Sequence, residues 1–119
     1  MSTERARHRF TVDDYERMVE AGILGQDDHV ELIRGEIVEM SSIHPPHSST
    51  VMRWTMVLAP RLAGRAIVSV QGPIRLGRYS MPQPDLVVLR PREDFYRSGH
   101  AAAADVLLAV EVADSSLRY

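Results

Sequence analysis

Two short apolar runs constrain the fold more than any other feature of the chain. They cover residues 84–89 and 106–112, and both are dense in branched side chains. Runs of this kind are typical of strands that are buried on both faces. Each run also carries one carboxylate near an end, Asp85 in the first and Glu111 in the second. Because an unpaired carboxylate is costly to bury, each acid needs a partner or a cation.

Lysine is not available as that partner, because all 14 Lys and Arg residues of the chain are Arg. Any function that requires a lysine amine is therefore excluded. Cysteine is absent too, which excludes disulfides, thiolate zinc sites and cysteine nucleophiles and fits a reducing compartment. The first ten residues are charged and have no apolar stretch, and no run reaches membrane-spanning length. We expect a cytoplasmic protein with no membrane partner.

The length of the chain predicts one folded domain. Its 119 residues are enough for a single core, and 45% hydrophobic and 25% charged residues are ordinary globular values. Residues 1–10 are predicted to form a polar N-terminal arm, and residues 11–119 the domain. The net charge of -2 points to no class of partner, since a nearly neutral surface can still carry a basic stripe.

The first third of the domain predicts a helix followed by a hairpin. Thr11 and Asp14 fit a helix N-cap with acids in the first turn, so we expect a helix from about residue 12 to 21. Residues 30–40 contain two strand-like runs on either side of Arg34-Gly35. This arrangement predicts a tight hairpin.

The middle of the chain predicts the principal core helix. It follows the proline-rich stretch 43–48, and Ser48 or Ser49 is expected to cap it. Apolar residues then recur at helical spacing. Pro60 is expected to kink the helix or to end its regular part near Ala59, since proline lacks an N–H donor.

The remaining segments complete an α/β fold. Residues 66–70 and 73–76 are expected to form strands on either side of Gln71-Gly72. The two apolar runs follow as buried strands, with a polar loop or short helix over residues 90–105 between them. The order of helix, hairpin, helix, strands, loop and strand predicts a layered domain with a central sheet.

Three carboxylates stand at strand positions beside apolar residues: Glu31, Asp85 and Glu111. Each one alone is best explained as an acid at a strand edge, solvated or paired with an arginine. Together they match a hard cation such as Mg²⁺, which takes one or two carboxylates beside water and substrate phosphate. Two acids at matching ends of adjacent strands would supply this arrangement, and phosphodiester hydrolysis is one reaction that such a metal can promote.

Other polar residues have simpler explanations. We expect no zinc site at His44 and His47, because the prolines between them hold the segment extended. His47 is either close to a substrate or simply a residue at the start of a helix, and the second explanation is favoured. Several arginines are expected to flank the acidic edge, as phosphate contacts or equally as ordinary surface residues; they are Arg75, Arg78, Arg90, Arg92 and Arg97.

Four stretches resemble the successive motifs of one known family. They are residues 30–40, His47 before the helix, residues 83–88 and residues 110–116. In order and spacing they look like the motifs of the Uma family of restriction endonucleases, in the PD-(D/E)XK nuclease superfamily. The resemblance implies a restriction-endonuclease-like core, with a central mixed β-sheet flanked by helices. It also implies dependence on Mg²⁺, with Mn²⁺ as an alternative, and DNA as the partner.

The resemblance implies a role for each acid. Asp85 corresponds to the motif aspartate and Glu111 to the second acid, both as metal ligands. Glu31 corresponds to an acid that assists the metal or orients water. The superfamily's lysine would stand two residues after Glu111, where this chain has Ala113. Since that lysine would orient the attacking water and offset charge on the phosphate, its absence predicts reduced activity or none.

Relatives of this kind carry the lysine in a helix that follows the last strand, whereas this sequence stops at Tyr119. The expectation is a C-terminally truncated domain that lacks the C-terminal helix and strands. Its last strand would then have an uncovered apolar face, which favours self-association, with a dimer as the expected assembly.

Three hypotheses of function follow. In the first, the chain is a metal-dependent endonuclease that hydrolyses DNA phosphodiester bonds: Asp85 and Glu111 hold Mg²⁺, and Glu31 supports it. In the second, it is a catalytically impaired nuclease-like fold that binds DNA or another protein. In the third, it is a fragment with no function of its own.

Overall fold

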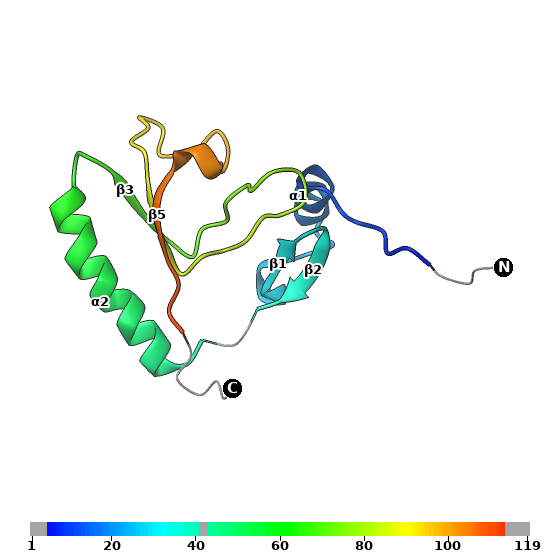
Figure 1. Cartoon of the computed structure of the whole chain (residues 1–119), viewed down its shortest axis with the longest axis horizontal. Coiled ribbons are helices and arrows are strands. Elements are labelled where there is room, and N and C mark those ends of the chain that lie inside the picture. Colours follow the sequence, from blue (N-terminus) through cyan, green and yellow to red (C-terminus); the bar gives the residue numbers. More distant parts are fainter. Residues whose placement is uncertain (1–4, 41–42, 114–119) are drawn as a thin grey trace.

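The computed structural model describes residues 5–40 and 43–113. Figure 1 shows α1 and the β1–β2 hairpin at one end of the molecule, and α2 beside a second sheet at the other end. Residues 1–4 of the predicted arm and residues 114–116 of the last motif lie outside the described residues. The elements in chain order are α1 (Val12–Glu20), η1 (Gln26–Asp28), β1 (Val30–Ile33), β2 (Glu36–Glu39), α2 (Pro45–Leu62), β3 (Ile67–Val70), β4 (Leu86–Leu89), η2 (Ala103–Asp105) and β5 (Val106–Val110).

The predicted first helix is confirmed as α1. Thr11 is its N-cap and forms a capping box with Asp14, in which each side chain accepts from the other residue's backbone N–H. Such a box satisfies two of the N–H groups that a helix start leaves without partners. Val12 and Tyr15 of α1 are buried and pack with Leu32 and Met81, so the helix is held against the hairpin.

The predicted hairpin is also confirmed. β1 and β2 pair antiparallel, and Arg34 and Gly35 in the turn have φ of 50° and 82°. Positive φ at both central residues is what a type I′ turn requires. Gly35 is needed for a second reason, because a Cβ there would lie 2.6 Å from Arg9 Cβ. The N-terminal segment therefore crosses directly over the turn.

The second sheet has the order β3-β4-β5, and both of its strand pairs are antiparallel. The α/β class is confirmed, but the expected single central mixed sheet is wrong for the described residues, which form two small antiparallel sheets. Residues 73–76 do not form the expected strand either. They make isolated bridges, of which Arg75–Ala102 is parallel, because this segment crosses between the two sheets instead of joining one.

Helix α2 starts earlier than predicted and runs through Pro60 to Leu62. His44 is its N-cap without a side-chain hydrogen bond, so the expected cap at Ser48 or Ser49 is wrong. Pro45 at the first helical position explains this, since it is pre-set for a helix and has no N–H to satisfy. Pro60 lies inside the helix, which continues for two more residues although the proline offers no N–H donor. No helix of the described residues is long and apolar enough to cross a membrane.

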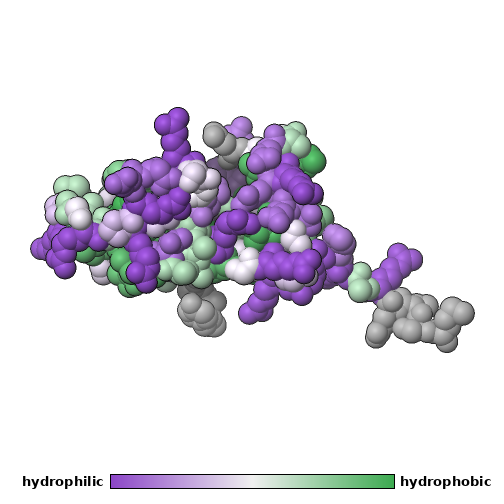
Figure 2. Space-filling view, turned by 90° about the horizontal axis from the view of Figure 1, so that it is seen from above, coloured by the Kyte–Doolittle hydropathy of each residue, from purple (hydrophilic) through white to green (hydrophobic). Residues whose placement is uncertain are grey.

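The two predicted buried strands differ in burial. All four residues of β4 are buried, as predicted. In β5, however, Leu107 is 51% exposed and Leu108 47% exposed, so burial on both faces is wrong for this strand. β5 is an edge strand of the described sheet, with only β4 as its neighbour. Figure 2 shows apolar areas between hydrophilic ones on the face seen from above.

Candidate active site

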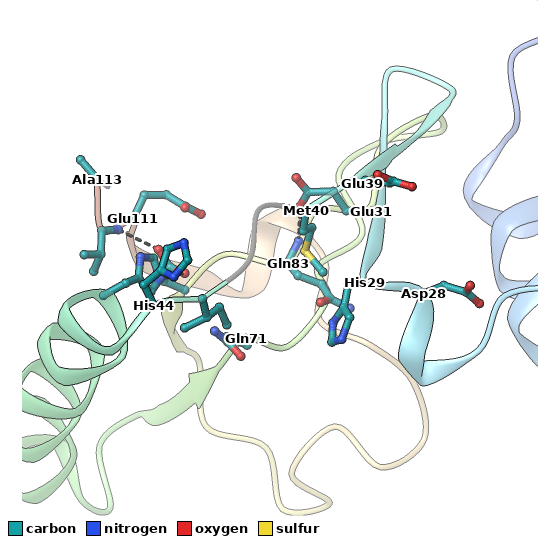
Figure 3. Close-up of a pocket in the computed structure, with 14 residues that line it drawn as sticks. Asp28, His29, Glu31, Glu39, Met40, His44, Gln71, Gln83, Glu111 and Ala113 are labelled. Atoms are coloured by element: carbon teal, nitrogen blue, oxygen red, sulfur yellow. Dashed lines mark hydrogen bonds and ion pairs between the residues drawn. The ribbon is translucent and has the colours of Figure 1, made fainter. Parts of the chain in front are cut away.

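A pocket of about 1000 Å³ lies between the hairpin and the second sheet. Figure 3 shows Glu111, Ala113 and His44 on one side of it and Glu31, Gln83 and His29 on the other. All three predicted site residues line it. The described residues that line it are Asp28, His29, Glu31, Glu39, Met40, Ile43, His44, His47, Gln71, Gln83, Asp85, Glu111, Val112 and Ala113.

Strand register brings Asp85 and Glu111 together. Leu86 is paired with Val110 across β4 and β5. In an antiparallel pair the residue before one partner faces the residue after the other, so Asp85 and Glu111 leave the same end of the sheet side by side. The two acids therefore lie at matching ends of adjacent strands.

Asp85 is the most strongly held acid of the pocket. Its Oδ1 lies 2.8 Å from His47 Nε2, and its Oδ2 accepts a 2.7 Å hydrogen bond from the Val112 backbone N–H. The Asp85 side chain is 13% exposed. One carboxylate thus connects the start of α2, the start of β4 and the end of β5.

Glu31 enters the pocket from the hairpin. Its Oε2 accepts a 2.9 Å hydrogen bond from the Gln83 N–H. The next residue of β1, Leu32, exchanges backbone hydrogen bonds with Met81, which fixes the segment 81–85 against the hairpin. Because two residues span at most about 7 Å, the attachment at Gln83 keeps Glu31 near Asp85.

Glu111 carries the electrostatic signature of a crowded acidic site. Partial burial of its carboxyl group raises its pKa above the usual value, and the charges of Asp85 and Glu31 raise it further. The two neighbours oppose ionisation because like charges repel. A cation placed among the three carboxylates would remove this repulsion.

The described lining of the pocket is acidic and contains no arginine. Five carboxylates face three histidines there: Asp28, Glu31, Glu39, Asp85 and Glu111 against His29, His44 and His47. A phosphate would be repelled from this lining unless a cation entered first.

The arginines expected at the acidic edge lie elsewhere. Arg90 follows the end of β4 opposite to Asp85, and Arg92 is bound to Asp94 in the loop beyond. Arg75 pairs with Asp13 and Glu16 of α1. None of the five arginines is among the described residues that line the pocket, and β4 separates Arg90 and Arg92 from Asp85 by roughly 13 Å, so the expectation that they flank the acids is wrong.

The donor set suits a hard divalent cation, although no closed cage is present. Within residues 5–40 and 43–113, no three His, Asp or Glu side chains are grouped closely enough to hold a metal ion by themselves. Mg²⁺ does not need such a cage, because it keeps several waters and takes one or two carboxylates beside substrate phosphate. Asp85 uses one acceptor position on each oxygen, so each oxygen keeps a second one for a ligand. Asp85 and Glu111 therefore fit as metal ligands.

Sequence reasoning gave His47 too little weight. It was assigned mainly to the helix start, whereas its ring contacts Asp85. The position of His47 in the chain was the available signal. A short connection joins α2 to β3, so the start of the helix lies at the same end of the sheet as Asp85. Ala113, at the position of the superfamily's lysine, also lines the pocket.

Comparison with known proteins gives one family. The model of the Uma2 family, described as "Putative restriction endonuclease", matches residues 12–119. No curated protein matches the chain. The match covers every helix and strand described above.

Proposed function

Because the chain belongs to the Uma2 restriction-endonuclease family over residues 12–119, we propose that it is a metal-dependent endonuclease that hydrolyses DNA phosphodiester bonds. One observation carries the proposal: Asp85, Glu111 and Glu31 share a pocket in which partial burial, followed by the charges of Asp85 and Glu31, raises the pKa of Glu111. Carboxylates that repel one another in a pocket favour a bound cation, which relieves the repulsion.

Each acid has a separate part in the proposal. Asp85 and Glu111 would hold Mg²⁺, or Mn²⁺, at the end of the β4–β5 pair. Glu31 would orient water from the opposite wall, where the Gln83 N–H fixes its carboxylate. When bound, the metal supplies a Lewis acid for the phosphate oxygens and lowers the pKa of water.

The acidity of the pocket gives the proposal a consequence for binding. Five carboxylates and no described arginine surround the space that a phosphate would enter. DNA should therefore engage this pocket only after a divalent cation has bound. Ala113 at the position of the superfamily's lysine predicts slow cleavage, because this position offers no ammonium group to offset charge on the phosphate.

The absence of a lysine at position 113 also favours a second function. Ala113 stands where the superfamily's lysine would stand, which fits a nuclease-like fold that binds DNA without cleaving it. Such a module would bind DNA with salt-dependent affinity but would leave the backbone intact.

The test is the nicking of supercoiled plasmid by purified protein with Mg²⁺ or Mn²⁺, and with a chelator. We expect nicking only with the metal, and its loss in Asp85→Asn. Asp27→Asn makes the same change at an exposed position that does not line the pocket, and it should cleave like the parent. An intact plasmid with the parent protein, or equal nicking by Asp85→Asn, would contradict the proposal. Metal-dependent DNA binding without nicking would favour the second function.

A further inference from the structure

His47 holds the acid that connects three elements of the pocket. The 2.8 Å contact between its Nε2 and Asp85 Oδ1 joins two side chains that are only 19% and 13% exposed. A carboxylate oxygen accepts hydrogen bonds, so Nε2 is the donor. The contact ties the first turn of α2 to the residue that precedes β4.

The local sequence directs His47 to this place. Pro45 and Pro46 occupy the first two helical positions, which puts His47 third, in the first turn. α2 then packs on β3, and Val70 at the end of β3 pairs with Leu86. Because consecutive elements joined by a short connection run antiparallel, the start of α2 lies level with the start of β4.

The electrostatics of the helix start support the same contact. α2 has no acidic residue in its first turn. The partial positive charge at the helix N-terminus is therefore not neutralised locally, and it favours the Asp85 carboxylate beside it.

The Asp85 carboxylate is held on both oxygens. His47 donates to Oδ1, and the Val112 N–H donates to Oδ2. Two donors from different elements leave the carboxylate little freedom to rotate. Its remaining acceptor positions are thus oriented before any ligand arrives.

We propose that His47 is the positioning residue of this site: by donating to Asp85 Oδ1, it fixes the orientation in which Asp85 meets a divalent cation. The inference rests on the proposed function, since it takes Asp85 as a metal ligand. It requires a hydrogen-bond donor at this position and no proton transfer. Partners that orient a metal ligand in this way typically contribute about 10–100-fold to metal affinity.

The alternative is that His47 only packs α2 against the sheet. Two substitutions separate the roles. His47→Gln keeps an N–H donor at a similar distance from the backbone, whereas His47→Leu fills similar space without a donor. Packing alone predicts that the two variants behave alike.

The experiment measures Mn²⁺ binding by calorimetry in the absence of DNA, for the parent and both variants. We expect His47→Leu to bind Mn²⁺ roughly 10–100-fold more weakly and His47→Gln to stay close to the parent. His100→Leu, at an exposed position that does not line the pocket, is the matched control and should bind like the parent. Urea unfolding checks that each variant is folded, and His47→Met replaces His47→Leu if the latter is not.

Two results would overturn the inference alone: Mn²⁺ affinity in His47→Leu equal to that of the parent, or affinity in His47→Gln as low as in His47→Leu. A parent protein that binds no Mn²⁺ would instead overturn the proposed function. The two failures are distinguishable because binding is measured without cleavage.

Discussion

β4 and β5 lie side by side, and each adjoins one acid of the pocket at the same end of the sheet, but their environments differ. Every residue of β4 is at most 5% exposed, whereas Leu107 and Leu108 of β5 are about half exposed. β4 has a strand on each side, while β5 has one only on its β4 side in the described sheet. A central strand is covered by its neighbours, and an edge strand depends on what else packs against it.

The same contrast extends to the two acids. Asp85, before the central strand, is held by His47 and the Val112 N–H. Glu111, after the edge strand, has a carboxyl group whose pKa is raised by partial burial and by its acidic neighbours. Asp85 is thus fixed by contacts, whereas burial and neighbouring charge oppose the ionisation of Glu111. The two acids should respond differently to substitution, to metal and to pH.

The largest expected difference is in cleavage. We expect Asp85→Asn to slow plasmid nicking by roughly 10³-fold or more, because it removes a metal ligand and weakens the contact that links α2, β4 and β5. Glu111→Gln removes a ligand but leaves those contacts, and it should slow nicking by about 10²-fold. Nicking rates at saturating Mn²⁺ measure both. A slower rate for Glu111→Gln than for Asp85→Asn would contradict the ranking of the two acids.

Matched leucine substitutions test the burial of the two strands. Leu86 of β4 is 1% exposed, so Leu86→Ala should lower the free energy of unfolding by about 2–5 kcal/mol. Leu108 is 47% exposed, so Leu108→Ala should cost less than about 1 kcal/mol. Urea unfolding at two protein concentrations measures both. If Leu108→Ala lost as much free energy of unfolding as Leu86→Ala, and if this loss grew with protein concentration, a second copy of the chain would cover β5. The expected dimer would require this result.

Local sequence patterns predicted the elements better than their environments. The helix N-cap at Thr11 and the turn at Arg34-Gly35 depend on neighbouring residues, and both were predicted. The apolar runs of β4 and β5 look alike in sequence, but their burial depends on which strand is central. That property is set by pairing between distant segments, which composition does not encode.

The candidate site was predictable to a similar extent. The three acids were identified because carboxylates beside apolar strands need a partner, and the structure places all three at one pocket. The role of His47 was underestimated, since the path from α2 through β3 to β4 decides what it meets. Arg90 and Arg92 follow the end of β4 opposite to Asp85, and Arg75 pairs with α1, because the fold and not the local sequence decides what each arginine meets. The roles of the three acids in catalysis and metal binding remain predictions.

Metal binding should stabilise the protein through both acids. Free Mn²⁺ at 100 times its dissociation constant should raise the free energy of unfolding by about 2.7 kcal/mol. Asp85→Asn should lose nearly all of this gain, and Glu111→Gln should keep a part of it, because the better-held ligand remains. Urea unfolding with and without Mn²⁺ measures the gain, with chelator as the reference. An equal gain in Asp85→Asn would show that the metal binds elsewhere.

The smallest effect concerns the pH dependence of the metal-free protein. The pKa of Glu111 is raised above its ordinary value of 4.5, chiefly by burial and then by Asp85. In the window between the two values the folded state binds more protons than the unfolded state, so stability falls as pH rises through it. Glu111→Gln cannot ionise. Its free energy of unfolding should therefore increase relative to that of the parent as pH rises from about 4.5 towards neutral.

Glu93→Gln is the control, because it removes the same charge at an exposed position that does not line the pocket. Its free energy of unfolding should show no such increase relative to the parent. Urea unfolding in chelator across this range measures the difference. A difference between Glu111→Gln and the parent that stays constant with pH would mean that neither burial nor the charges of Asp85 and Glu31 raise the pKa of Glu111. The contrast between the two acids would then be one of contacts alone.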